Sequence, residues 1–122
     1  MLLGSYSYKT SGTVEISGEQ IVLPNESGAL EVQKESENAL RLVFNQMGGG
    51  VYMTTATLKD DVLTLDTLFR TIQVGLEPYD LAVVGTGNYH DGIIIFDLQY
   101  NGTSMQSDST LLGKDILMVA KK

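Results

Sequence analysis

The sequence lacks several residues on which other classes of small protein depend. Its 122 residues contain no cysteine, no tryptophan, one histidine and two prolines. Without cysteine the chain can form neither a disulfide framework nor a Cys-ligated metal site, so its stability has to come from a packed core. A chain of this length buries about 65% of the surface that its unfolded form exposes, which is enough for such a core. We therefore expect one domain over residues 1–122.

Basic residues are also few. The sequence has 8 Lys and Arg and 15 Asp and Glu, which gives a net charge of −7. A field of that sign repels phosphate backbones, and the basic residues do not cluster before Lys121 and Lys122, so nucleic-acid binding is not expected. The simplest interpretation of the acidity is solubility, with a basic partner as the alternative. No run approaches the ~20 apolar residues of a membrane helix, so no transmembrane segment is predicted.

The beginning of the sequence bears on localisation. Met1-Leu2-Leu3 is too short for the apolar region of a signal peptide, and strand-like sequence starts a few residues later. We therefore expect the protein to be periplasmic, anchored to the outer membrane or extracellular after removal of a leader, with a cytoplasmic location as the alternative.

Helical periodicity is nearly absent, whereas glycine, Thr, Val, Ile and Tyr are frequent, as is typical of strands and turns. The clearest pattern lies at residues 79–102, which read as two long strands joined by a turn at His90, Asp91 and Gly92. The second arm alternates as a strand does when one side faces a core. Its apolar face carries Ile94, Phe96, Leu98 and Tyr100.

Further strands follow one another with short connections. We predict hairpins at residues 30–45 and 51–66, other strands near residues 4–17, 20–23, 70–74 and 115–120, loops at residues 25–28 and 101–113, and a short helical turn as an option at residues 67–69. Sequential antiparallel strands form a meander, and a meander of about 8–10 strands removes its two edges by curling until the first strand meets the last. The predicted fold is all-β, an antiparallel up-and-down meander closed into a barrel.

No constellation of catalytic or metal-binding residues is visible. His90 stands beside Asp91 in a turn without a positioned nucleophile, so we interpret it as a solvated residue and not as a base or ligand. The acidic turn residues do not match the spacing of a calcium loop. We therefore predict no catalytic residue, no metal site and no cofactor.

The residues most relevant to an interior site are those expected to line the barrel. The candidate barrel-lining residues are Phe44, Phe96, Leu98, Tyr100, Gly85 and Gly87. The two glycines lie two apart on one strand face, where they either bend the closing sheet or widen an internal cavity. The expected inward side chains are bulky enough to fill a small barrel, which favours a packed core over a cavity.

Two stretches resemble a known family. The opening GSYSYKTSGTVEI and the late pair VVGTGNYHDGIIIFDLQYNGT resemble the small calycin-like (lipocalin-like) β-barrel proteins and lipoproteins of Bacteroides-type gut bacteria. The resemblance implies a lipocalin-like up-and-down barrel, an exported or cell-envelope location and no known reaction. The chain lacks the Gly-x-Trp of true lipocalins, the helix-turn-helix of fatty-acid-binding proteins and the tryptophans of avidins, so no specific ligand carries over.

These observations together predict a non-enzymatic lipocalin-like barrel that acts as a cell-envelope or exported accessory or interaction protein with an unknown partner. The alternative is a binder of a small apolar or amphipathic ligand inside the barrel. An enzyme is not expected, because no catalytic motif is present.

Overall fold

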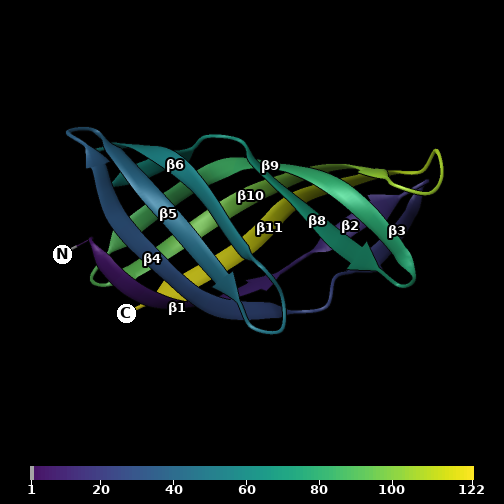
Figure 1. Cartoon of the computed structure of the whole chain (residues 1–122), viewed down its shortest axis with the longest axis horizontal. Coiled ribbons are helices and arrows are strands. Elements are labelled where there is room, and N and C mark those ends of the chain that lie inside the picture. The colour runs from purple at the N-terminus through teal and green to yellow at the C-terminus, as the bar shows by residue number, and fades with distance from the viewer. Residues whose placement is uncertain (1) are drawn as a thin grey trace.

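The structure, a computed structural model, describes residues 2–122, and all of its regular elements are antiparallel strands (Figure 1). In chain order they are β1 (Gly4–Ser11), β2 (Thr13–Ile16), β3 (Glu19–Val22), β4 (Glu26–Ser36), β5 (Ala39–Gln46), β6 (Val51–Lys59), β7 (Val62–Leu65), β8 (Leu68–Val74), β9 (Glu77–His90), β10 (Ile93–Ser104) and β11 (Thr110–Lys121). The described residues include no helix of the length and apolarity needed to span a bilayer. The all-β prediction is confirmed.

The barrel closes because the first strand pairs with the last. Hydrogen-bonded neighbours follow the order β1-β4-β5-β6-β7-β9-β10-β11, and β11 returns to β1 with Ser7 opposite Lys121 and Ser11 opposite Leu117. The eight positions of this ring follow the chain except where the β2–β3 hairpin intervenes between β1 and β4 and where β8 intervenes between β7 and β9. The predicted closed meander is therefore confirmed, with extra strands attached to it.

The extra strands β2, β3 and β8 extend the wall at one end of the barrel. β2 continues the line of β1 along β11, and β8 continues the line of β7 along β9 (Figure 1). Among residues 2–122, β3 pairs only with β2 and β8 pairs only with β9. The sheet is therefore interrupted between β3 and β8, and this interruption is the feature that positions the candidate site.

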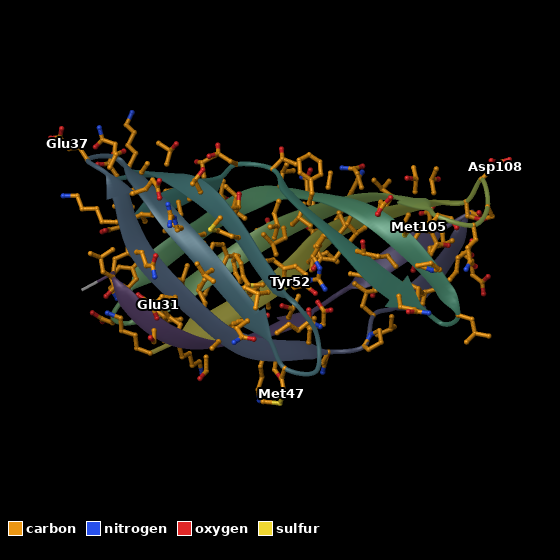
Figure 2. The ribbon with its side chains drawn as sticks, viewed as in Figure 1. Glu31, Glu37, Met47, Tyr52, Met105 and Asp108 are labelled. Carbon is orange, nitrogen blue, oxygen red and sulfur yellow. The ribbon has the colours of Figure 1, made fainter. Side chains whose placement is uncertain are left out.

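The core lies inside the closed part and follows from the alternation of the strands. In β10 every second residue is buried, and the apolar face predicted from the sequence has exposed fractions of 0–3%. Inward residues of the other strands are buried as well, among them Val14, Leu30, Val32, Leu42 and Phe44. Figure 2 shows Glu37 and Met47 projecting away from the barrel, and both are exposed.

Two predicted loops are in fact strand. Residues 26–28, the last three of the predicted loop at 25–28, open β4 because they pair with β1, where Glu26 lies opposite Thr10. They do so although they follow Asn25 in a run of turn formers. Gly28 serves close packing and not a turn, since a Cβ there would lie 2.2 Å from the carbonyl oxygen of Asn45. Cross-strand pairing outweighs the local preference of these residues.

The predicted loop at residues 101–113 was wrong over most of its length. β10 continues to Ser104 and β11 begins at Thr110, with Thr103 opposite Thr110. Residues 67–69 form no helical turn either, because β8 begins at Leu68 and pairs with Val83. In both places the residues themselves have only a weak preference for strand, and hydrogen bonding to a long neighbouring strand keeps them extended.

Candidate functional site

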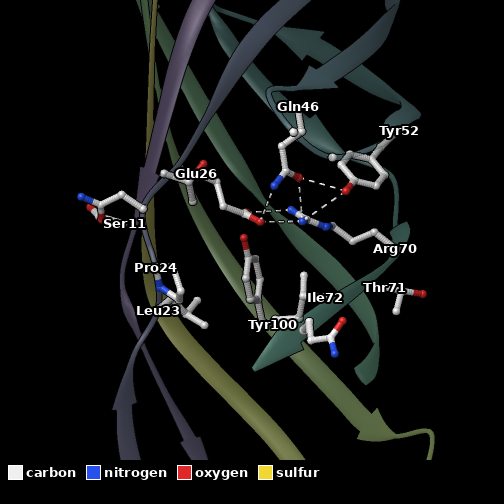
Figure 3. A pocket seen from close by; sticks show the side chains of 15 residues that line it. Ser11, Leu23, Pro24, Glu26, Gln46, Tyr52, Arg70, Thr71, Ile72 and Tyr100 are labelled. Atoms are coloured by element: carbon white, nitrogen blue, oxygen red, sulfur yellow. Dashed lines mark hydrogen bonds and ion pairs between the residues drawn. The ribbon is translucent and has the colours of Figure 1, made fainter. Parts of the chain in front are cut away.

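A groove opens in the wall of the barrel where the sheet is interrupted (Figure 3). We call it the side groove, and its volume is about 440 Å³. Residues 70–73 of β8 form one bank and residues 23–26, which lead from β3 into β4, form the other. Gly48 and Gly49 lie at one end, and Tyr52 and Tyr100 contribute from inside the barrel.

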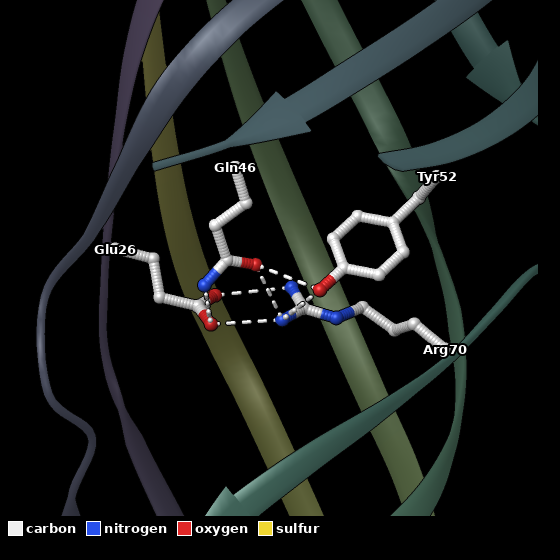
Figure 4. A network of polar contacts seen from close by, with 4 residues as sticks. All are labelled: Glu26, Gln46, Tyr52 and Arg70. Atoms are coloured by element: carbon white, nitrogen blue, oxygen red, sulfur yellow. Dashed lines mark hydrogen bonds and ion pairs between the residues drawn. The ribbon is translucent and has the colours of Figure 1, made fainter. Parts of the chain in front are cut away.

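A network of four polar side chains lies in this groove (Figure 4). The Arg70 guanidinium donates two hydrogen bonds to the Glu26 carboxylate, of 3.0 and 2.8 Å, and a third of 2.9 Å to Gln46 Oε1. Gln46 Nε2 donates to Glu26 at 2.9 Å, and the Tyr52 hydroxyl donates to Gln46 at 2.9 Å. Arg70 also lies over the Tyr52 ring, 4.4 Å from its centroid. Each residue is thereby held by at least two contacts.

The arginine at the centre of the network is unusually enclosed for a charged residue. Its side chain is only 8% exposed and that of Glu26 is 23% exposed. Burial alone would lower the pKa of Arg70, but the hydrogen bonds and the charge of Glu26 outweigh it and raise the pKa overall. Arg70 therefore stays protonated, and the pair adds no net charge to the groove.

Two buried polar atoms at this groove have no hydrogen-bond partner. Among the described residues, the Thr10 hydroxyl and Arg70 Nε are the buried side-chain nitrogen or oxygen atoms without one. Both residues line the side groove, and Thr10 is 4% exposed. An unsatisfied buried polar group costs about 1–3 kcal/mol, so native structures hold few of them, and such groups commonly mark functional sites. Their coincidence in one groove makes it the candidate binding site.

The Tyr100 hydroxyl adds a third polar group. Tyr100 lines the groove, and Figure 3 shows its hydroxyl directed toward Glu26 and Arg70. Burial raises the pKa of Tyr100 to about 12, against the opposing effect of the Arg70 charge. The hydroxyl therefore remains neutral at physiological pH and can both donate and accept a hydrogen bond.

The interior of the closed part leaves little space. Its cavity is about 20 Å³, and its lining includes Phe44, Phe96, Leu98 and Tyr100. A cavity needs roughly 10–15 Å³ to hold one water molecule, so the interior has room for a single water and not for a ligand of several heavy atoms. These four predicted barrel-lining residues are thus brought together inside the barrel, where they pack against one another.

Gly85 and Gly87 serve close packing between β9 and β10. A Cβ on Gly87 would lie 2.6 Å from Phe96 Cδ1, and a Cβ on Gly85 would lie 2.2 Å from the carbonyl oxygen of Asp97. Neighbouring atoms therefore fill the space that the missing side chains leave. The option that these glycines widen an internal cavity is not supported by this geometry.

His90 lies where the sequence places it. It ends β9 beside the turn, its side chain is 89% exposed, and Nε2 is 3.2 Å from Asp91 Oδ2. Within residues 2–122, no group of three or more histidine, aspartate or glutamate side chains is arranged to hold a metal ion.

Sequence reasoning missed the residues that form the side groove. Glu26 and Arg70 are 44 positions apart, and no local motif connects them. One signal was available, because the alternation in β8 places Arg70 on the inward face between Leu68 and Ile72. A charge on an otherwise apolar strand face requires a partner inside the barrel.

Comparisons with known proteins support the architecture. No protein-family model matches the sequence, and no curated protein matches it significantly. Among solved structures, the chain is similar to a redesigned β-barrel, b11L5F_LGL, with 14% identity, a TM-score of 0.50, and coverage of 99% of this chain and 90% of that one. It is also similar to a redesigned β-barrel, mFAP1, bound to DFHBI, with 16% identity, a TM-score of 0.48 and coverage of 99% and 94%. At 14% identity the likeness to b11L5F_LGL shows the fold alone.

Proposed function

We propose that this protein is a non-enzymatic binding protein whose ligand occupies the side groove and not the barrel interior. The single observation that carries this proposal is that Thr10 and Arg70 line the same groove and that, among the described residues, they are the two with a buried polar side-chain atom lacking a partner. A ligand that hydrogen-bonds to them would recover the free energy that each unmet group costs. The groove volume of about 440 Å³ falls within the usual range of ligand sites.

Binding without catalysis is favoured by the way the charged groups are used. Glu26 and Arg70 are the charged residues of the groove lining, and they are bonded to each other. A general base or nucleophile needs a free group within reach of the substrate, and neither partner of this closed pair offers one. The alternative ligand, a small apolar or amphipathic molecule inside the barrel, would have to displace packed core side chains.

The proposal is tested by the amide NMR spectrum of the isotope-labelled chain in the presence of small uncharged amides, alcohols and sugars. We expect shifts to cluster at Thr10, Arg70 and Ile72, and Thr10→Val to weaken the response. A straight-chain alkyl carboxylate serves as the probe for the interior site. Shifts confined to Phe96 and Leu98 with that probe, or no cluster with any compound, would contradict a groove site.

We also propose that the protein is exported and works at the cell envelope, as the lipoproteins of Bacteroides-type bacteria do. The support for this location is the sequence resemblance of the first strand and of the β9–β10 pair. Fractionation of cells that express the native gene tests it, and recovery of the protein in the cytoplasm would contradict it.

A further inference from the structure

We infer that the ligand of the side groove is an extended peptide, which adds to the barrel as a strand along the unpaired edge of β8. This inference rests on the proposed function and names the class of ligand. It follows from the shape of the groove, from the edges that border it and from its charge.

The banks of the groove are backbone edges. Residues 70–73 are consecutive, so both inward and outward residues of β8 line it, and the same holds for residues 23–26 opposite. Successive residues of a strand point to opposite faces, so a pocket that contacts only one face of a strand meets every second residue. Contact with consecutive residues shows that the groove runs along the edge of β8, in the position of a neighbouring strand.

Among residues 2–122, one edge of β8 has no strand partner, although β6 lies close to part of this strand. Its residues from Leu68 to Val74 pair with β9 on one side, and no described strand pairs on the other. Natural proteins commonly protect such an edge with proline, lysine, a bulge or a short strand. β8 (LFRTIQV) has no proline, lysine or bulge and is seven residues long. Its one charge, Arg70, points inward, which is itself a common protection of an edge, but here Glu26 neutralises that charge.

The free edge of β3 offers a contrast. β3 is a strand of four residues, and Pro24 follows shortly after it. It is therefore short and blunted, as unpaired edges usually are. The difference marks β8, and not β3, as the edge left available for a partner strand.

The chemistry of a peptide backbone suits this position. The side groove is neutral overall because Glu26 and Arg70 cancel, and its lining includes Thr10, Arg70 and Tyr100, of which Thr10 Oγ1 and Arg70 Nε are buried without a hydrogen-bond partner. A peptide backbone is neutral and offers alternating donors and acceptors, which can pair with the free N–H and C=O groups of a strand edge. An uncharged polar side chain of the peptide that points inward would lie near Thr10, Arg70 and Tyr100. The outward residues of the added strand would lie beside Phe69, which is 76% exposed on the outer face of β8. The chain charge of −7 favours peptides with basic flanks.

The experiment selects peptides from a displayed library of random linear sequences of roughly ten residues, long enough to pair with a strand like β8. The best synthetic peptide is then measured against the wild type, Thr71→Lys and Thr57→Lys. Thr71 is exposed at the centre of β8, and a lysine there protects the edge while keeping Asp80 as a partner. Thr57 is an exposed threonine of β6 with a strand on either side, which makes it the matched control.

We expect Thr71→Lys to weaken binding at least about tenfold, equivalent to 1.4 kcal/mol, and Thr57→Lys to leave it unchanged. N-methylation of single peptide amides should abolish binding at alternate positions only, because every second amide of an added strand faces its neighbour. This alternation is specific to strand addition and does not depend on the stability of any variant.

Three results would overturn the inference. The first is that the library yields no peptides enriched on the wild type relative to the Thr71→Lys variant. The second is that the enriched peptides bind equally well after N-methylation at any position. The third is that the chain forms a dimer that Thr71→Lys dissociates, while no peptide binds. If small amides or sugars still shift Thr10 and Arg70 in the NMR experiment, the groove remains a binding site and only the peptide is excluded. If neither probe affects the groove, the proposed function fails as well.

Discussion

Gly87 lies opposite Phe96 in the β9–β10 pair, and the Phe96 ring occupies the space that a side chain at position 87 would need. Phe96 is 0% exposed and is enclosed by other core residues, and the cavity of about 20 Å³ that it lines is far smaller than its ring. The missing side chain on one strand thus determines where a core ring on the next strand can lie.

The first prediction follows from this contact. Gly87→Ala places a Cβ 2.6 Å from Phe96 Cδ1 and should lower the free energy of unfolding by about 1–3 kcal/mol, as overpacking of cores does. Urea denaturation measures the change. Gly50→Ala is the control, because its Cβ would lie 3.8 Å from the nearest Tyr52 atom, and a loss as large there would contradict the explanation.

The second prediction concerns the buried ion pair. Glu26→Gln leaves the Arg70 charge, with its side chain 8% exposed, without a carboxylate, and should cost about 2–3 kcal/mol of unfolding free energy. The matched change Glu35→Gln breaks the exposed pair with Arg41 and should cost at most about 1 kcal/mol. Equal losses in chemical denaturation would show that Arg70 finds other solvation once Glu26 is neutral.

The third prediction separates stability from binding at the side groove. Thr10→Val removes a buried hydroxyl without a partner and should raise the free energy of unfolding by about 1 kcal/mol. Thr54→Val removes a buried hydroxyl that donates to the Asp66 carbonyl at 3.0 Å, so it should be destabilising instead. Thermal and urea unfolding of both variants test the difference in sign. A destabilising Thr10→Val would mean that the hydroxyl already has a partner in solution.

The fourth prediction is a fall of stability in alkali. The pKa of Tyr100 is about 12 in the folded chain, mainly because of burial, against an ordinary value of 10. The folded state therefore holds this proton more tightly than the unfolded state. The resulting stabilisation is complete below pH 10 and is lost as the pH rises from about 10 to about 12.

Urea titrations across this pH range measure the effect, and tyrosinate absorbance follows the ionisation itself. Tyr100→Phe should flatten the decline only in part, since burial raises the pKa of Tyr8 to about 12 as well. A pH dependence that the substitution leaves unchanged would assign the whole effect to other tyrosines.

The fold was accessible from the sequence because alternation survives wherever one strand face is apolar. In β10 the buried side chains from Ile94 to Tyr100 occupy every second position, and the Asp91-Gly92 turn marks the start of the strand. The strand ends were less accessible. Gly28 and Asn101 belong to residue types common in turns, and only their pairing with neighbouring strands shows that they continue a ladder.

The candidate site could not be predicted in the same way. It depends on β8 following β7 along the same side of β9, which leaves the wall open beside Arg70. That arrangement is a property of register across the barrel and not of any local pattern. The position of Arg70 between Leu68 and Ile72 indicates a buried charge, but the sequence does not reveal that Glu26 is its partner.

The pairing of β1 with β11 has a consequence for how the protein is made. The two strands whose pairing closes the barrel, β1 and β11, are separated by most of the chain. The β1–β11 pairing therefore cannot form until β11 has left the ribosome. Until then the growing polypeptide presents β1 and β10 as unpaired edges that other nascent chains can meet. We expect slow, late folding with a need for chaperones during synthesis, as non-local strand pairing generally imposes.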